Sequence, residues 1–218
     1  MKKRVLISIA LLILLTTITS QEKILISKFN LKEINIENNF LLKEKEINEI
    51  LTPFYGKNLI FLKNNEIQKA LMQSSLIESF VTKKKYPDTL IIKIFEKKPL
   101  AILINKNTKY YLSEKIDLIE FKNFKEYQDL PYIFGNRKKF KIFYENLIKI
   151  NFPLNSINKY TLFKADRWDI ETKDKKLIKL PIKDYTKSLK NYLELVNKND
   201  FKKYEVFDYR IQNQLILK

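Results

Sequence analysis

The most informative part of the chain is YPDTLIIKIFEKKPLA, residues 86–101. Residues 89–95 are strand-like, and a second strand-like run, residues 77–84, comes shortly before them. Pro87 and Asp88 suit a tight turn between the two runs, because the proline ring fixes φ and the aspartate carboxylate can bond nearby backbone donors. The stretch therefore predicts a β-hairpin.

The residues before this hairpin predict one strand and two helices. Residues 31–36 form a short strand-like run whose period slips by one, as at a bulge, and residues 44–51 repeat apolar side chains at helical spacing. Asn64 or Asn65 is a suitable N-cap for a second helix, since either side chain can accept a hydrogen bond from a free helix N–H. The predicted order is therefore β-α-α-β-β.

After a domain boundary near residues 97–99, the pattern changes to short strands with two helices. The expected strands are residues 100–104, 109–112, 116–121, 132–134, 161–163, 168–171, 176–180 and 207–217, and the expected helices are residues 137–150 and 185–196. Strands and helices that do not alternate regularly are typical of the α+β class. The chain is therefore predicted to be an α+β protein with a small first domain and a β-rich second domain.

The N-terminus carries a membrane signal. Residues 1–4 include three basic side chains, and residues 5–20 carry no charge. The ten large aliphatic residues between Val5 and Ile18 supply about −3 to −6 kcal/mol of insertion free energy. Residues 5–20 are therefore predicted to be a transmembrane helix after a cytoplasmic tail of residues 1–4. This helix would span ~24 Å of a ~30 Å hydrocarbon core, and flanking basic side chains can snorkel to close the gap.

The alternative to an anchor is a cleaved signal peptide. Thr17 and Thr19, or Ile18 and Ser20, would then occupy the positions before the cut, and neither pair is the favoured small-residue site. In both cases the basic head stays in the cytoplasm and the rest of the chain is exported.

The scarcity of three residue types limits the kinds of catalytic and ligand-binding site that the chain can form. The chain has no His, no Cys and only two Gly, which excludes a Ser-His-Asp triad, a thiol nucleophile, an ordinary zinc site, a disulfide and a glycine-rich phosphate loop. Ser156 and Lys159 form an S-x-x-K match, but the S-D-N and K-T-G motifs that accompany it in penicillin-binding proteins do not occur. We therefore expect no enzyme, no metal and no other cofactor.

The formal net charge is +17 and the pI is about 9.7. The 42 basic residues are scattered through every segment, which indicates a lysine-rich composition with solvated faces and not a nucleic-acid site.

Residues 86–101 are similar to the P-x-T-L-x-I-x-V-x-E-[RK]-x-P-[VI]-A signature of the FtsQ/DivIB family of cell-division proteins. Residues 56–61, GKNLIF, resemble the family's G-x-N-[LI] step between helices. Three further matches are residues 130–135 to L-P-x-[IL]-x-G, residues 207–210 to [VI]-D-[LV]-R, and residues 167–170, where the family often has Arg, Trp and a strand. The resemblance implies a POTRA domain, a small βααββ module of bacterial envelope proteins, at residues 27–97, and an FtsQ-type β domain at residues 98–218.

The resemblance also implies a function. It predicts a non-enzymatic, single-pass scaffold that links early and late division proteins at the septum by β-strand augmentation. The expected location is the inner membrane, type II, with the N-terminus cytoplasmic and the bulk periplasmic. The implied partners are FtsB-like and FtsL-like coiled-coil proteins and an FtsK-like recruiter, with no nucleic acid and no small-molecule substrate. The alternatives are a secreted basic protein that binds lipid or nucleic acid, and another POTRA-containing envelope protein.

The expected partner-binding residues lie on two strands, with Arg167 near the second of them. A strand at the end of the chain can form a sheet edge with unpaired N–H and C=O groups, and the resemblance points to the same strand. The expected residues are Arg167, Asp208, Arg210, Ile211, Asn213, Gln214, Leu215 and Ile216 in the second domain, and Thr82, Lys83 and Lys84, for the FtsK-like recruiter, in the first.

Several of these residues also have a plainer interpretation. Arg167 offers a planar fork for a partner carboxylate, but it can equally be an ordinary surface arginine. Asp208 and Arg210 share one face of a strand and can simply orient it, and Leu215 can be a core residue. The lysines near Thr82 can be a solvated edge that discourages aggregation.

Overall fold

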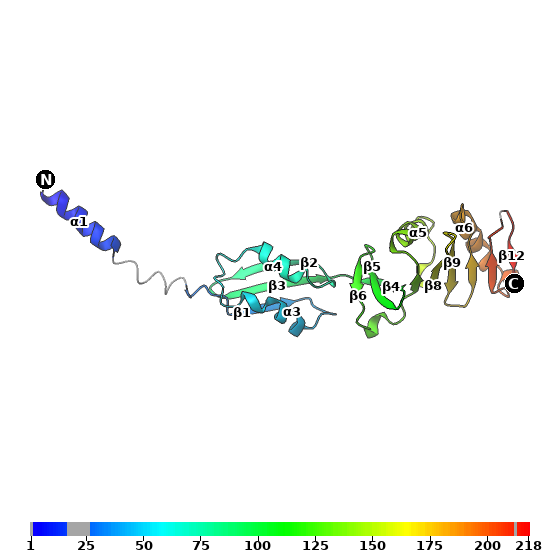
Figure 1. Cartoon of the computed structure of the whole chain (residues 1–218), viewed down its shortest axis with the longest axis horizontal. Coiled ribbons are helices and arrows are strands. Elements are labelled where there is room, and N and C mark those ends of the chain that lie inside the picture. The colour runs from blue at the N-terminus through cyan, green and yellow to red at the C-terminus, as the bar shows by residue number, and fades with distance from the viewer. Residues whose placement is uncertain (1, 17–26, 212) are drawn as a thin grey trace. The chain divides into compact units, whose positions relative to one another are not determined.

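The computed structural model describes residues 2–16, 27–211 and 213–218 (Figure 1). The chain divides into two compact units, Met1–Lys97 and Lys98–Lys218. Over the described residues, the first unit holds a three-stranded sheet and the second a nine-stranded sheet. Helices accompany both mixed sheets, which confirms the predicted α+β class.

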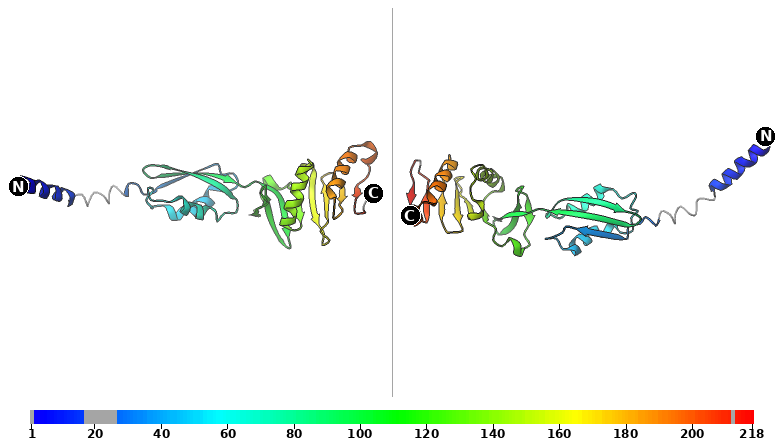
Figure 2. Two further views of the ribbon diagram at one scale, coloured as in Figure 1. Left: turned by 90° about the horizontal axis from the view of Figure 1, so that it is seen from above. Right: turned by 180° about the vertical axis from the view of Figure 1, so that it is seen from behind.

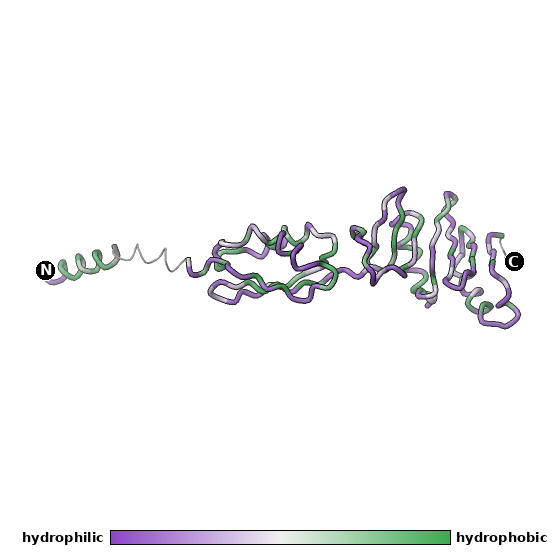
Figure 3. Tube along the Cα trace, turned by 90° about the horizontal axis from the view of Figure 1, so that it is seen from below, coloured by the Kyte–Doolittle hydropathy of each residue, from purple (hydrophilic) through white to green (hydrophobic). Residues whose placement is uncertain are grey.

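The N-terminal helix α1 spans Lys2–Thr16. Most of it is hydrophobic (Figure 3), and its basic start is helical because Lys and Arg are good helix formers. Within the part of the chain that the structure describes, no helix has both the length and the apolar character that a membrane crossing requires. The predicted transmembrane segment, residues 5–20, overlaps α1 as far as Thr16, and its last four residues lie outside the described ones.

The first unit has the predicted β-α-α-β-β order. Its elements are β1 (Glu33–Glu37), α3 (Glu44–Leu51) followed by the 3-10 turn η2 (Thr52–Phe54), α4 (Asn64–Leu71), β2 (Ile77–Lys85) and β3 (Thr89–Glu96). β2 and β3 form the predicted antiparallel hairpin, and β1 lies parallel to β3 on its other side. The sheet order is β1-β3-β2, so β1 and β2 are its edges.

The helices of this unit cover one face of its sheet (Figure 2). Leu90, Ile92 and Ile94 alternate along β3 and are fully buried, as are Ile47 of α3 and Ile67 of α4. Burial of each of these side chains contributes about 1.5–3 kcal/mol. The alternating apolar residues of β3 and the apolar faces of α3 and α4 therefore form one core.

The N-cap of α4 is Lys63, so the prediction of Asn64 or Asn65 is wrong. Asn64 is the first helical residue, and its side-chain oxygen accepts a hydrogen bond from Thr82 Oγ at 3.0 Å. A partner on β2 thus takes the place of the local helix cap that the sequence suggested.

The end of β3 fixes the loop before α3. The Glu96 carboxylate accepts backbone hydrogen bonds from Phe40, Leu41 and Leu42 at 2.8–3.0 Å. Three donors on one carboxylate hold the loop firmly, because hydrogen bonds to a charged group are stronger than neutral ones. The loop therefore presents the Phe40 side chain, which is 82% exposed, in a fixed place.

We expect Glu96→Gln to loosen this loop by about 1–3 kcal/mol, because the amide keeps one acceptor but loses the charge. Amide hydrogen exchange of a peptide covering residues 38–43 measures the change and should be about 5- to 150-fold faster. Glu49→Gln, at an exposed position in the middle of α3, is the matched control and should leave the exchange unchanged. Equal exchange in both variants would show that Glu96 does not hold the loop.

The second unit is built on one long mixed sheet. Its strands are β4 (Pro99–Asn105), β5 (Thr108–Ser113), β6 (Leu118–Glu120), β7 (Tyr132–Phe134), β8 (Ile157–Leu162), β9 (Trp168–Thr172), β10 (Leu177–Lys179), β11 (Val206–Asp208) and β12 (Ile216–Leu217), and its helices are α5 (Arg137–Lys149) and α6 (Tyr185–Val196). The sheet order is β12-β11-β10-β9-β8-β7-β4-β5-β6. In Figure 2 the colours accordingly run from green to red along this sheet.

Aromatic side chains join both helices to the sheet. Phe143 of α5 stacks on Trp168 of β9 with ring centroids 4.8 Å apart, and Tyr192 of α6 meets Phe207 of β11 edge-on at 4.9 Å. All four belong to one buried core. Gly135 lies at the edge of this core, where a Cβ would come within 2.8 Å of the Leu162 Cβ, so only glycine fits without a shift.

The end of the chain is not the single strand predicted over residues 207–217. Instead, β11 and β12 are two short antiparallel strands, and β11 also pairs in parallel with β10. Asn213 in the connection has φ 58°, a left-handed conformation that asparagine adopts more readily than most residues. The chain therefore reverses before its last strand.

Candidate protein-binding edge

The candidate site is the β12 edge of the nine-stranded sheet, opposite the β6 edge. Among the described residues, β12 pairs only with β11. The backbone N–H groups of Val206 and Lys218 each donate to the other residue's carbonyl, at 2.9 and 3.1 Å. Residues of an antiparallel strand alternate between facing the partner strand and facing away from it. The N–H and C=O of Leu217 therefore point away from β11.

The side chains of this edge alternate as well. Leu215 and Leu217 are partly buried and pack against the core of the unit, whereas Gln214 and Ile216 are exposed. The two leucines thus hold the segment on the sheet and leave its outer backbone accessible. Ile211, which is 50% exposed, lies in the connection before Asn213.

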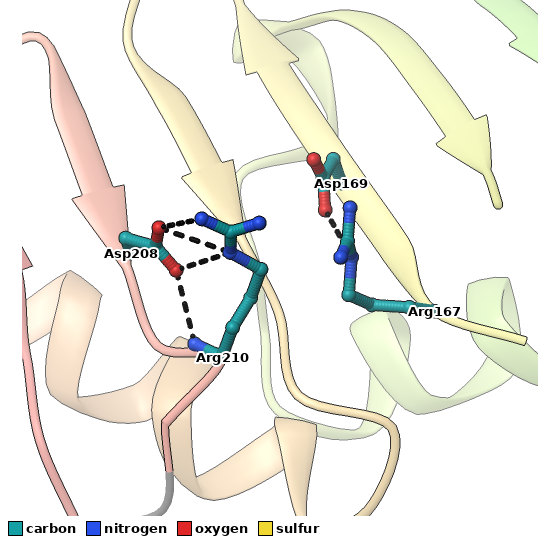
Figure 4. A network of polar contacts seen from close by, with 4 residues as sticks. All are labelled: Arg167, Asp169, Asp208 and Arg210. Carbon is teal, nitrogen blue, oxygen red and sulfur yellow. Dashed lines mark hydrogen bonds and ion pairs between the residues drawn. The ribbon is translucent and has the colours of Figure 1, made fainter. Parts of the chain in front are cut away.

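Asp208 and Arg210 form an ion pair beside this edge (Figure 4). The Arg210 guanidinium donates to both oxygens of the buried Asp208 carboxylate at 2.6–3.0 Å, and its own backbone N–H donates to Oδ1 at 3.1 Å. Hydrogen bonds from Arg210 hold the pKa of Asp208 below its usual range. The Asp208 carboxylate is thus occupied within the chain, while the Arg210 side chain stays 45% exposed.

Arg167 and Asp169 form a second ion pair on β9 and the residue before it. Arg167 Nε donates to Asp169 Oδ1 at 3.2 Å, and the guanidinium lies over the Phe163 ring at 4.3 Å from its centroid. The Asp169 side chain is only 6% exposed. Burial raises the pKa of the Asp169 carboxyl, and Arg167 offsets part of that rise.

Lys179 of β10 connects the two pairs. It is in register with Asp169 on one side and with Asp208 on the other, so these three residues form a row across three strands. With Arg167 and Arg210, the group has three cations and two carboxylates, which leaves one net positive charge on a row that runs from β9 to β11, the strand beside β12. We call these five residues the charged row.

Asp208 and Asp169, the two carboxyl groups of the charged row, should affect the free energy of unfolding with opposite dependences on pH. The lowered pKa of Asp208 means that its contribution is present above the unfolded value of about 3.9 and is lost as pH falls. The raised pKa of Asp169 means that its contribution is present below about 3.9 and is lost as pH rises through the folded pKa. We therefore expect Asp208→Asn to lower stability more at pH 7 than at pH 3, and Asp169→Asn to preserve or raise it at pH 7.

Urea unfolding of both variants at the two pH values measures this difference. An Asp208→Asn variant that loses the same stability at pH 3 and at pH 7 would show that the Arg210 pair does not set the Asp208 pKa.

Thr82, Lys83 and Lys84 lie on the β2 edge of the first unit, whereas the other predicted residues belong to the second unit, and the three do not share a face. Thr82 bonds Asn64 of α4, and Lys84 Nζ donates to the Ile60 and Leu62 carbonyls at 3.3 and 2.8 Å. Lys83 points to the opposite face and is exposed. Of these three residues, only Lys83 thus offers a charged group that has no hydrogen-bond partner among the described residues.

The S-x-x-K residues are not assembled into a catalytic pair. Ser156 Oγ donates to the Pro153 carbonyl at 2.7 Å in the 3-10 turn Leu154–Ser156, whereas Lys159 lies on β8 and pairs with Glu171. Over the described residues there is also no cluster of acidic side chains suited to a metal ion.

Sequence reasoning missed Asp169, Lys179, Leu217 and Lys218. Asp169 stands two residues after Arg167, so strand alternation could have placed it on the same face. Lys179 and Lys218 had no local signal, because their role depends on the register between strands that are distant in the sequence.

Comparisons with known proteins agree with this architecture. The family model described as "POTRA domain, FtsQ-type" matches residues 29–97. "Cell division protein FtsQ" of Rickettsia conorii is 28% identical over 193 residues, which cover 85% of this chain and 71% of that protein. The protein of the same name from Rickettsia bellii is 27% identical over 193 residues, with the same coverage. "Cell division protein DivIB" of Clostridium acetobutylicum is 30% identical over 87 residues, 40% of this chain and 34% of that protein.

Proposed function

Because the chain belongs to the FtsQ/DivIB family of cell-division proteins, we propose that it is a scaffold of the division machinery whose β12 edge accepts a strand from a partner. The family generally consists of non-enzymatic division proteins of the cell envelope.

The observation that carries the mechanism is the position of β12 at the end of the nine-stranded sheet. A sheet edge offers a row of N–H and C=O groups to an incoming strand, and main-chain hydrogen bonds then supply affinity while side chains supply specificity. Leu217 provides one outward N–H and one outward C=O at this edge. The proposed partners here are the FtsB-like and FtsL-like coiled-coil proteins.

The charged row supports a preference for an acidic partner. The Arg210 side chain is 45% exposed, and its guanidinium keeps donors beyond the two nitrogens that bond Asp208. Arg167 uses only Nε for Asp169. A partner carboxylate beside β12 can therefore bond Arg210, which follows the neighbouring strand β11, without breaking its ion pair with Asp208. Arg167 lies before β9, three strands from β12, so a partner that reaches it must also extend across the sheet. Ile211, Asn213, Gln214, Leu215 and Ile216 would surround this contact.

For the first unit, we propose that the β2 edge receives an FtsK-like recruiter, with Lys83 as the exposed contact and with Thr82 and Lys84 fixing the strand to α4 and the preceding loop. For the membrane, we propose that residues 5–20 form a single uncleaved span. The basic residues before it would stay in the cytoplasm, and both units would lie in the periplasm at the septum.

Depletion in growing cells tests the proposed function. The expected result is filaments without septa, because the late division proteins are no longer linked to the early ones. Normal division after depletion would overturn the proposal. Mass analysis of the mature protein tests the anchor separately, since loss of residues 1–20 would mean a cleaved leader.

A further inference from the structure

Three segments of the first unit meet where the chain enters it: residues 28–32, 55–63 and 84–88. Backbone hydrogen bonds join them, from Leu31 N–H to the Lys57 carbonyl and from Lys32 N–H to the Asp88 carbonyl, both at 2.9 Å. The rings of Phe29 and Tyr86 also meet, with centroids 6.0 Å apart. We call this end of the unit the entry pole.

The entry pole exposes apolar side chains from neighbouring segments. Phe61 is 71% exposed, and Tyr55, Ile60 and Tyr86 are each 41–55% exposed. A single exposed apolar residue is normal on a protein surface, but several together indicate an interaction site. Phenylalanine, isoleucine and tyrosine at one end of a domain are the residue types that enter the boundary of a lipid bilayer.

The charge of the entry pole is positive. Its lysines are Lys28, Lys32, Lys57, Lys63, Lys84 and Lys85, and the carboxylates beside them are Glu33, Glu66 and Asp88, so six cations face three anions. Lys32 pairs with Asp88 and Lys57 with Glu66. Lys28, Lys63 and Lys85 make no ion pair with any residue that the structure describes. These three are available to an acidic surface.

The chain length sets an upper limit on how far this pole can lie from α1. Eleven residue steps separate Thr16, where α1 ends, from Ser27, where the described chain resumes, and a chain of that length reaches at most about 36–40 Å. β3 starts at the entry pole and ends at Glu96, so the opposite end of the unit is farther along the chain from α1. Of the two ends, the entry pole is the one tethered to the proposed membrane segment.

We propose that the entry pole rests on the acidic headgroups of the membrane in which α1 is anchored. Phe61, Ile60 and the two tyrosines enter the headgroup boundary, and Lys28, Lys63 and Lys85 bind the headgroup phosphates. This inference rests on the proposed single-pass anchor. Its consequence is that the first unit holds a fixed orientation on the membrane.

A tryptophan reporter in the full-length chain tests the contact. Phe61→Trp is reconstituted into vesicles that contain phosphatidylglycerol, with nitroxide-labelled lipid as quencher, and the signal of Trp168, the one natural tryptophan, is subtracted using the unmodified protein. The matched control is Phe40→Trp, at a position that is 82% exposed against 71% for Phe61, on the Glu96-held loop at the other end of β3. The expected result is strong quenching at position 61 and none at position 40.

Charge reversal and salt give the second readout. Lys63→Glu with Lys85→Glu should lower the position-61 quenching about fivefold or more, because each lysine near an acidic surface contributes about a factor of five in affinity. Pure phosphatidylcholine or high salt should have a similar effect. Protein that inserts into vesicles but shows equal quenching at positions 61 and 40 overturns this inference alone. Protein that does not insert overturns the anchor proposed above.

Discussion

Leu217→Pro lowers the affinity for a strand-donating partner by roughly 5- to 150-fold. The outward N–H of Leu217 is the donor that β12 offers at its free edge, and proline removes it. A partner carbonyl that is left unsatisfied in the interface costs about 1–3 kcal/mol, which corresponds to that change in affinity. Calorimetric titration with the periplasmic part of an FtsB-like partner measures it.

Two matched variants separate the backbone effect from other effects. Leu217→Ala loses the same packing against the core but keeps the N–H, so it should bind much more tightly than Leu217→Pro. Ile216→Pro removes an N–H that faces β11, because Ile216 is paired with Asp208 one step along the strand. It should therefore weaken folding of the edge itself. Equal affinity of Leu217→Pro and Leu217→Ala would contradict strand addition.

Trp168→Ala destabilises the second unit by about 3–5 kcal/mol. The Trp168 ring is stacked on Phe143 at 4.8 Å, lies 6.0 Å from Phe140 and is almost fully buried. Truncation of a buried tryptophan to alanine removes this area and leaves a cavity. For a unit of this size the melting temperature should fall by roughly 10–20 °C. Calorimetry of the full-length chain shows the change as one displaced transition.

Because the two units are compact and separate, the transition of the first unit should stay in place. Trp168→Phe is the control, since it keeps an aromatic ring against Phe143 and should lose much less. If Trp168→Ala shifts both transitions together, the units do not fold independently. If it shifts neither by more than about 1 kcal/mol, Trp168 does not hold the core.

The first unit could be predicted from the sequence because its signals are local. The hairpin of β2 and β3 is set by the turn at Pro87 and Asp88 and by the alternation of Leu90, Ile92 and Ile94, all within one short stretch. The prediction of Asn64 or Asn65 as the N-cap of α4 was wrong, because the Asn64 side chain accepts a hydrogen bond from Thr82 on β2. Capping rules consider only neighbouring residues, so they do not predict a contact between residues 18 positions apart.

The end of the chain could be predicted only in part. The sequence from Phe207 to Leu217 has strong strand propensity, but in the structure this segment is divided into β11 and β12, with Asn213 in a left-handed conformation between them. A single asparagine is not enough to predict such a turn. The alternation rule placed Asp208 and Arg210 on one face of a strand, whereas Arg210 follows β11 and folds back onto the Asp208 carboxylate. Lys179 enters the charged row through the parallel register of β10 and β11, which no single stretch of sequence encodes.

Amide hydrogen exchange at single-residue resolution, with and without the FtsB-like partner, shows whether β12 accepts a partner strand. If a partner strand pairs with the outer edge of β12, exchange of the Leu217 amide slows at least about tenfold, because that N–H gains a hydrogen-bond acceptor. The Lys218 amide, which already bonds the Val206 carbonyl, should change far less. Binding of the partner with no change at Leu217 would rule out strand addition at β12.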